Sequence, residues 1–162
     1  MDKSMKAVKM AIRTYLDNRA KTDELFAVAY AKPNKNIDEC MKYILGEAKK
    51  WEAQYQETKG KFFGICFGNE NIVITVIQSV AEMAEEGHAM HHCVYQNGYY
   101  KKPNSLILSA KSKDGKRIET IEIDLKTFSL IQSRGVCNQN TKHHNEIIKL
   151  VEENINLIKQ VA

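Results

Sequence analysis

The sequence predicts an α+β fold, in which N-terminal helices are followed by a mainly antiparallel sheet of about five strands with an internal helix and a C-terminal helix packed on it. Up to about residue 57, apolar residues recur at intervals of three and four, which is typical of amphipathic helices. From about residue 62 they gather into short β-rich runs separated by turn residues. This change of period divides the chain into a helical N-terminal region, residues 1–57, and an α+β domain, residues 58–162.

Composition is typical of a globular protein without disulfides or membrane spans. Its 162 residues, 43% hydrophobic and 27% charged, suffice for one core and a small helical appendage. The four cysteines show no paired spacing and no apolar signal segment precedes them, so we expect free thiols and a cytoplasmic location. No apolar run reaches the roughly 20 residues of a membrane helix, so no membrane is expected as a partner. The net charge of +4 favours loose contact with polyanions, although a solvated surface of mixed charge is the simpler interpretation.

Three helices are predicted in the N-terminal region, over about residues 2–20, 25–30 and 37–57. Thr22 and Asp23 can cap the second helix. Pro33, in a loop at residues 32–36, stops that helix because a proline disfavours helical geometry in the residue before it. The third helix has Asp38 near its start, and Gly46 weakens its centre by about 1 kcal/mol relative to alanine.

The α+β domain contains five predicted strands, over residues 62–67, 72–78, 106–110, 118–123 and 128–133. Residues 68–71 (GNEN) join the first two strands as a hairpin, and Asp114-Gly115 is a second hairpin signal. The pattern Ser79-Val80-Ala81-Glu82 is a capping box, so a helix is predicted to start there and to run toward Gly87. A final apolar stripe predicts a C-terminal helix from about residue 143 to 160.

The stretch GHAMHHCV, residues 87–94, holds three of the five histidines and one of the four cysteines. If the internal helix continues, His88, His91 and His92 lie at i, i+3 and i+4 on one face, which suits a divalent metal. The further ligands would be Cys137 and His143 or His144. A second interpretation makes Cys93 a thiolate nucleophile activated by a neighbouring histidine. The third is structural: Cys93 and Val94 fill the core, and the histidines line its rim or bond backbone.

A second polar segment, QSRGVCNQN at residues 132–140, follows the last predicted strand. Arg134 can bind a phosphate or a base edge with two hydrogen bonds, and Gly135 lets backbone approach closely. An ordinary strand exit, whose asparagines satisfy turn N–H groups, explains the same residues equally well. If this segment and the histidine cluster converge at the sheet, they form one pocket.

Residues from about 62 to 158 resemble the C-terminal domain of PcfJ-like proteins, which conjugative plasmids and related mobile elements encode. The resemblance lies in EEGHAMHHCV, YYKKPNSLILSAK, RIETIEID and IQSRGVCNQNT. These follow the family's order of a His-Cys-Val element, three strands and a Gln-x-Arg-Gly-x-x-Asn element. The N-terminal stretch of about residues 4–45, with AKTDELFAVAYAKPNKNIDECMKYIL, is similar instead to the opening of PcfK-like proteins, a companion family from the same elements.

The resemblance implies a role in conjugation or other mobile-element biology and one polar site, with no cofactor or metal assigned. The candidate catalytic residues are His91, His92, Cys93 and Arg134. The candidate binding residues are Gln132, Gly135 and Asn138, with Tyr99 and Glu122 as weaker additions.

Three functions remain open from the residues and the resemblance together. The preferred one is a noncatalytic accessory module that binds nucleic acid or a protein of the conjugation apparatus. It rests on Tyr95, Tyr99 and Tyr100 as stacking groups and on basic residues at 101, 102, 111, 113, 116 and 117. The alternative is an enzyme acting on a nucleotide or nucleic acid, with histidine as acid or base and Arg134 stabilising negative charge. The third is a structural zinc module.

Overall fold

The computed structural model describes residues 3–33 and 36–162, and the chain forms two compact units, residues 1–50 and 51–162. We call these the N-terminal unit and the C-terminal unit. The predicted helix start at residue 2 and positions 34 and 35 of the predicted loop lie outside the described residues. The boundary between the units lies within one helix, α3 (Ile37–Lys59), which the sequence predicts over about residues 37–57.

The N-terminal unit contains α1 (Lys3–Thr22), α2 (Glu24–Tyr30) and the first part of α3. Asp23 caps α2 as predicted, because its carboxylate accepts a hydrogen bond from the N–H of Phe26 at 2.9 Å. An ion pair between Lys9 and Asp38 links α1 to α3. Among the described side chains of this unit, only Met41 is buried. Its exposed large apolar side chains are Val8, Met10, Tyr15, Leu25, Val28, Tyr43 and Ile44.

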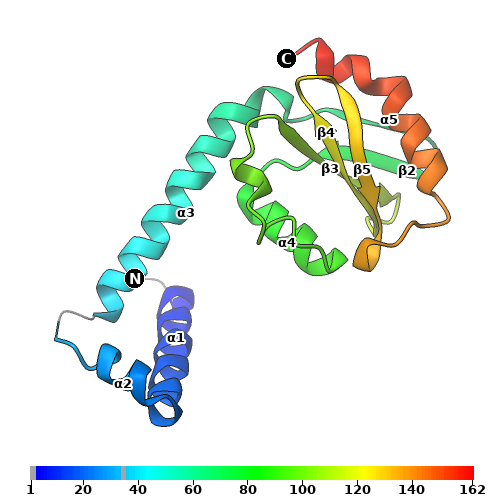
Figure 1. Ribbon diagram of the computed structural model, residues 1–162. Coiled ribbons are helices and arrows are strands. Elements are labelled where there is room, and N and C mark those ends of the chain that lie inside the picture. The colour runs from blue at the N-terminus through cyan, green and yellow to red at the C-terminus, as the bar shows by residue number, and fades with distance from the viewer. Residues whose placement is uncertain (1–2, 34–35) are drawn as a thin grey trace. The chain divides into compact units, whose positions relative to one another are not determined.

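The C-terminal unit is built on a five-stranded antiparallel sheet, as the sequence predicts (Figure 1). Its strands are β1 (Cys66–Gly68), β2 (Ile72–Val76), β3 (Ser105–Ser112), β4 (Arg117–Asp124) and β5 (Ser129–Arg134). Each strand pairs with the next one along the chain. The β1–β2 turn is held by Asn69, whose side-chain oxygen accepts the N–H groups of Asn71 and Ile72 at 2.8 and 2.9 Å. Gly115, at φ +84°, turns β3 into β4.

The position of the first predicted strand is wrong. Gly60–Phe62 form a 3₁₀ turn, and β1 begins only at Cys66. Phe62 is nevertheless 1% exposed, because it packs from this turn into the core. An aromatic residue in an apolar run is therefore buried here without belonging to a strand, and residue periodicity alone does not separate the two cases.

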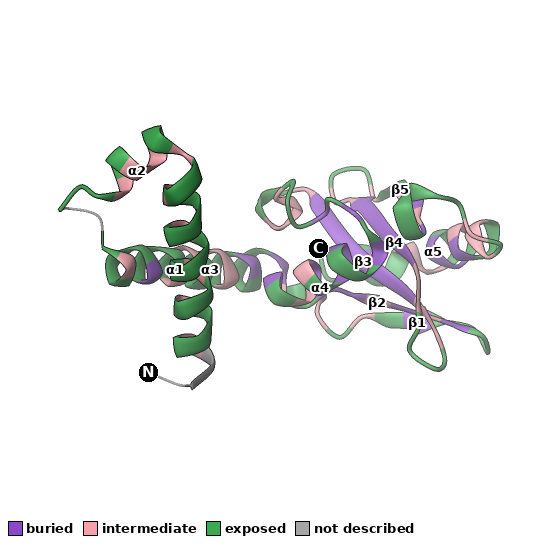
Figure 2. Ribbon diagram, turned by 90° about the horizontal axis from the view of Figure 1, so that it is seen from below, coloured by how far each residue is buried: buried purple, intermediate pink, exposed green. Residues whose placement is uncertain are grey.

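Two helices cover opposite faces of the sheet (Figures 1 and 2). α4 (Val80–Met90) begins with the predicted capping box: Ser79 Oγ accepts the N–H of Glu82 at 2.9 Å, and the Glu82 carboxylate accepts the N–H of Gln78 at 2.8 Å. α5 (His144–Lys159) packs on the other face, as predicted, with Ile147, Leu150, Val151 and Ile158. Side chains alternate along β3, so Leu106 and Leu108 contribute to the α5 core and Ile107 to the α4 core.

Over the described ranges, 3–33 and 36–162, the protein has no helix with the length and apolarity needed to cross a membrane.

Candidate functional site

A pocket of about 340 Å³ opens beside the α4 face of the sheet, in the C-terminal unit. The connection between α4 and β3 contributes His92, Cys93, Val94, Asn97 and Tyr99. The sheet contributes Ile107, Thr120, Ile121, Glu122, Gln132 and Arg134, and the loop after β5 contributes Asn138. The two polar segments singled out in the sequence therefore converge. Of the residues predicted for the site, His91 and Gly135 do not line the pocket, and all the others do.

The register of β4 against β5 builds the polar floor of the pocket. Glu122 pairs with Gln132, and Thr120 pairs with Arg134, two positions along each strand. Residues two apart project from the same face of a strand, so these four side chains lie together. A shift of register after Glu122 leaves Ile131 without a partner, and it is 53% exposed. This bulge keeps Gln132 and Arg134 on the pocket side of the sheet.

His92 is held in a defined orientation although it lies outside any helix. It is 7% exposed, and its Nε2 is 2.6 Å from the backbone carbonyl oxygen of Gly135. A carbonyl oxygen only accepts hydrogen bonds, so Nε2 must carry the proton and donate it. Among the described residues, Nδ1 of His92 has no hydrogen-bond partner. The ring therefore offers a lone pair at Nδ1 when the imidazole is neutral.

The predicted histidine face does not form, because α4 ends at Met90. His91 takes the left-handed conformation (φ 52°, ψ 44°) that ends the helix, so His91 and His92 leave the helical face that carries His88. His88 and His91 are both exposed. In the part of the chain that the structure describes, no group of three or more histidine, cysteine or acidic side chains is placed to hold a metal ion.

Cys93 lines the pocket and is exposed, whereas the structural interpretation of the sequence has it filling the core. Val94 is the residue buried there, at 6% exposure, in the cluster beneath α4. Cys40, Cys66 and Cys137 are also exposed free thiols, as expected from their spacing. Cys93 is thus accessible to a ligand in the pocket.

Glu122 supplies a carboxylate to the pocket lining. The Glu122 side chain is 7% exposed and accepts hydrogen bonds from Ser105 Oγ at 2.6 Å and from Gln132 Nε2 at 2.8 Å. Gln132 Nε2 also donates to Tyr99 Oη at 3.3 Å. Lys102 Nζ lies 3.7 Å from Glu122 and 3.3 Å from the centre of the Tyr99 ring. A buried carboxylate is thereby fixed among hydrogen bonds, with one lysine at the rim.

Arg134 supplies a guanidinium to the pocket lining. Its Nη1 donates to the side-chain oxygen of Asn140 at 2.6 Å and to the carbonyl of Ser133 at 3.3 Å. Asn138, at φ 61°, stands beside it in the left-handed conformation. Gly135 is required where the loop begins, since a Cβ there would lie 2.4 Å from Thr141 Cγ2. Because Nη1 alone is used in these bonds, Arg134 keeps donors for an anion.

Glu119 anchors the loop that carries Gly135 and Asn138. This fully buried carboxylate, on the α5 face of β4, accepts hydrogen bonds from Ser133 Oγ, from Thr141 N and Oγ1 at 3.0 and 2.7 Å, and from His144 Nδ1 at 2.9 Å. Burial by itself raises the pKa of Glu119, but the hydrogen bonds from Ser133, His144 and Thr141 outweigh it and hold the pKa below its ordinary value. Glu119 is not among the site residues that the sequence predicts. The alternation of Glu119 with Ile121 and Ile123 is the signal that places it on a buried face.

Glu86 anchors α4 to the same part of the sheet. Its buried carboxylate accepts hydrogen bonds from Arg117 Nε at 2.6 Å, Thr120 Oγ1 at 2.7 Å and Ser109 Oγ at 3.0 Å. Thr120 also lines the pocket. No pattern in the sequence singles out Glu86, because a glutamate in an amphipathic helix is ordinarily a solvated residue.

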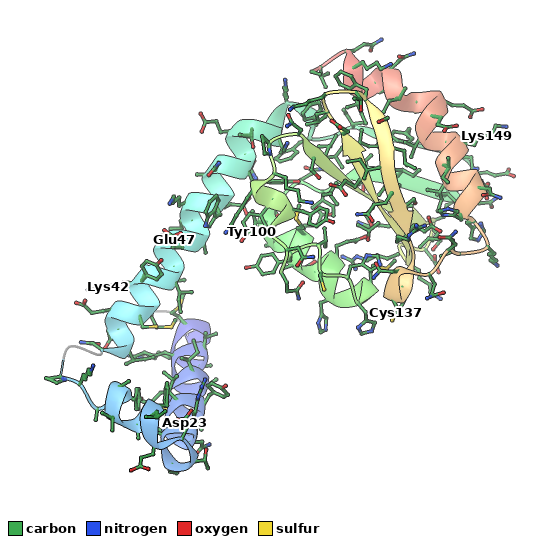
Figure 3. All side chains as sticks on the ribbon, in the orientation of Figure 1. Asp23, Lys42, Glu47, Tyr100, Cys137 and Lys149 are labelled. Atoms are coloured by element: carbon green, nitrogen blue, oxygen red, sulfur yellow. The ribbon has the colours of Figure 1, made fainter. Side chains whose placement is uncertain are left out.

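Beside the pocket lies a group of rings and lysines that we call the aromatic–lysine surface: Trp51, Tyr95, Tyr100, Lys101 and Lys102. Tyr95 and the two lysines are exposed, and Trp51 and Tyr100 are half-buried. Tyr95 and Tyr100 stack at 5.5 Å, and Trp51 meets Tyr100 edge-on at 6.0 Å. Lys101 Nζ lies 4.3 Å from the centre of the Trp51 ring. Tyr99 joins this surface to the pocket, because it lines the pocket and contacts Lys102. Tyr100 is labelled in Figure 3.

The fold and the pocket define an α+β domain with one polar site between a helix-ending loop and two neighbouring strands. The chain belongs to the PcfJ-like family, because the model of that family, described as PcfJ-like protein, matches residues 14–148. The match begins well before residue 62 and includes most of residues 4–45, and it shows no PcfK-like segment. No curated protein and no solved structure matches the chain.

Proposed function

We propose that this PcfJ-like protein is an accessory protein of a conjugative plasmid or related mobile element, and that it binds single-stranded nucleic acid in the cytoplasm. The pocket takes one nucleotide, and the aromatic–lysine surface takes its neighbours. The observation that carries this proposal is the continuity of the two through Tyr99. Stacking rings beside a cationic groove bind single strands without needing a particular sequence.

Charge supports a polyanionic partner. Residues 1–50 contain eleven lysines and arginines against seven acidic residues, and residues 51–162 contain thirteen of each, so the whole net charge of +4 lies in the N-terminal unit. Within the C-terminal unit the cations Lys101, Lys102 and Arg134 gather at the aromatic–lysine surface and the pocket. These positions provide local contacts to phosphates, and the N-terminal excess provides long-range attraction.

Binding of a dye-labelled single-stranded oligonucleotide, measured by fluorescence anisotropy, tests the proposal. We expect affinity to fall steeply between about 50 mM and about 200 mM salt, because phosphate contacts release counterions. The double variant K101A/K102A should bind roughly tenfold more weakly and show a shallower salt dependence, since each lysine lost removes about one phosphate contact.

The matched control for this experiment is K149A. Lys149 lies on α5, across the sheet from the pocket (Figure 3), and its ammonium group forms an ion pair with Glu153 at 3.7 Å. K149A should bind within about twofold of the wild type. Absence of binding at low salt would overturn the proposal. In that case the exposed apolar side chains and positive charge of the N-terminal unit would point to an acidic protein of the conjugation apparatus as the partner.

A second candidate function, an enzyme acting on a nucleotide or nucleic acid, is favoured by the geometry of His92. With Nε2–H donated to Gly135, the free Nδ1 is available as a general base beside the accessible thiol of Cys93. Arg134, at the same pocket, would stabilise negative charge on a phosphate. His92 would take the proton of Cys93, whose thiolate would attack phosphorus and displace an ester oxygen. His92 would return the proton to that leaving oxygen, and water would then hydrolyse the P–S bond to regenerate the thiol. His91, which is exposed and outside the pocket, has no role in this proposal.

Two substitutions separate the chemical role of His92 from its structural role. In H92Q the amide can still donate to the Gly135 carbonyl but no base remains at the Nδ1 position, whereas H92A removes both. If the protein turns over an oligonucleotide or nucleotide, H92Q should lower the rate about a hundredfold with binding unchanged. Product formation is measured by electrophoresis for an oligonucleotide and by chromatography for a nucleotide. Equal turnover by H92Q and the wild type would exclude His92 as the base.

A further inference from the structure

His92 and Cys93 are consecutive residues that line the same pocket. His92 is 7% exposed, and its Nε2–H is donated to the Gly135 carbonyl, so the orientation of the ring is fixed. Its Nδ1 has no hydrogen-bond partner among the described residues, and no fully buried side-chain nitrogen there lacks one. Nδ1 therefore lies at the small open part of the ring surface and presents its lone pair to the pocket.

Cys93 is an exposed free thiol, as are Cys40, Cys66 and Cys137. It differs from the other three because it lines a pocket that also contains the His92 imidazole and the Arg134 guanidinium. A thiol reacts as its thiolate, and a neighbouring base and a positive charge favour that form. An accessible cysteine in such surroundings is typical of thiols that are oxidised reversibly.

We propose that Cys93 is a site of reversible modification by small disulfides of the glutathione type, and that this modification regulates the pocket. His92 Nδ1 takes the proton of the Cys93 thiol, and the thiolate attacks one sulfur of the disulfide. A new S–S bond joins Cys93 to one half of the disulfide, the old S–S bond breaks, and the other half leaves as a thiolate that takes the proton from His92. Cys93 is thereby oxidised and the leaving half is reduced to a thiol. Excess free thiol reverses the exchange.

The charges of the pocket favour an acidic disulfide. Each half of oxidised glutathione carries two carboxylates and one ammonium group, and Arg134 keeps donors for a carboxylate because only its Nη1 is used within the protein. The Glu122 carboxylate is offset by Lys102, whose Nζ lies 3.7 Å away. A glutathionyl group in this pocket of about 340 Å³ would take the donors of Arg134 that the proposed function assigns to a phosphate. This regulatory consequence rests on the proposed function, whereas the modification itself does not.

Treatment with oxidised glutathione, followed over time by mass spectrometry of the intact protein and of its peptides, tests the modification. We expect Cys93 to react about tenfold faster than Cys40, Cys66 and Cys137, which serve as internal controls with exposed thiols. H92Q, which keeps a donor for Gly135 but has no base, should slow the reaction of Cys93 about tenfold and leave the other three rates unchanged. Equal rates at the four cysteines, or an unchanged rate at Cys93 in H92Q, would overturn the assignment.

The regulatory consequence is measured by fluorescence anisotropy with the labelled oligonucleotide. Treated wild-type protein should bind about tenfold more weakly than untreated protein, because a contact to phosphate is lost, and dithiothreitol should restore the affinity. The affinity of C93S should be the same before and after treatment. If selectively modified protein bound as tightly as untreated protein, the regulatory role would be excluded and the proposed function would stand. If untreated protein bound no oligonucleotide, the proposed function and this regulatory role would both fall, and the rates at the four cysteines would still decide the modification.

Discussion

Replacing Glu119 with alanine is expected to lower the free energy of unfolding of the C-terminal unit by about 4 kcal/mol. The carboxylate is fully buried and receives hydrogen bonds from Ser133 on β5, from Thr141 in the loop and from His144 at the start of α5. Alanine would leave all these donors without their acceptor. Urea unfolding followed by the fluorescence of Trp51, the only tryptophan, measures the loss.

The control for E119A is E153A on α5. Glu153 is 55% exposed and pairs with Lys149 at 3.7 Å, so its removal should change the free energy of unfolding by less than about 1 kcal/mol.

The pH dependence of stability gives a second test of Glu119. The pKa of Glu119 is lowered in the folded state, so its stabilisation is complete above the unfolded value of about 4.3 and is lost as the pH falls through the folded pKa. The difference in the free energy of unfolding between the wild type and E119Q should therefore shrink below about pH 4. A difference that does not change with pH would contradict this role of Glu119.

The second large effect concerns Lys59, in the last turn of α3. Its side chain is almost completely buried and donates to the carbonyl of Pro103. Burial, with a smaller contribution from Lys61, lowers the pKa of Lys59 to about 8. Between this value and the unfolded value of about 10.4, the unfolded chain binds a proton that the folded chain does not, so stability rises with pH in that interval.

We therefore expect the free energy of unfolding of the wild type to rise by about 3 kcal/mol relative to K59M between pH 8 and 10.5. Methionine has a similar length and no charge, so other titrating groups cancel in the difference. At pH 7, K59M should be the more stable protein, by less than that amount because it loses the hydrogen bond to Pro103. The exposed Lys149 provides the comparison: K149M should show no such pH dependence. If the free energy of unfolding of the wild type and of K59M changed in parallel with pH, Lys59 would be shown to stay charged in the folded protein.

Local sequence signals account for the parts of the fold whose stabilising contacts lie within a few residues. Asp23 and Ser79 are caps that act on the N–H three positions ahead, and the β1–β2 turn is closed by Asn69 within the turn itself. The apolar stripe of α5 likewise predicts both a helix and its buried face. Phe62 is the exception, because its burial depends on a distant core and not on a local period.

The candidate site shows the same division. The polar segments around His92 and Arg134 can be found in the sequence because their residue types are unusual there. The hydrogen bonds of these segments cannot be predicted from the sequence, since His92 bonds to Gly135 at a separation of 43 positions. The left-handed turn at His91 removes the helical face on which the metal interpretation depends. Glu86 and Glu119 act across elements, and composition does not distinguish them from solvated glutamates.

The sequence by itself determines the succession of helices and strands, most of their boundaries and the two polar segments, because periodicity, caps and turns act over a few neighbouring residues. Only the tertiary structure decides that these segments share one pocket, that Glu122 and Arg134 both line it, and that His92 presents Nδ1 and not Nε2. Those facts depend on strand register and on a hydrogen bond between distant parts of the chain, and neither leaves a local pattern in the residues.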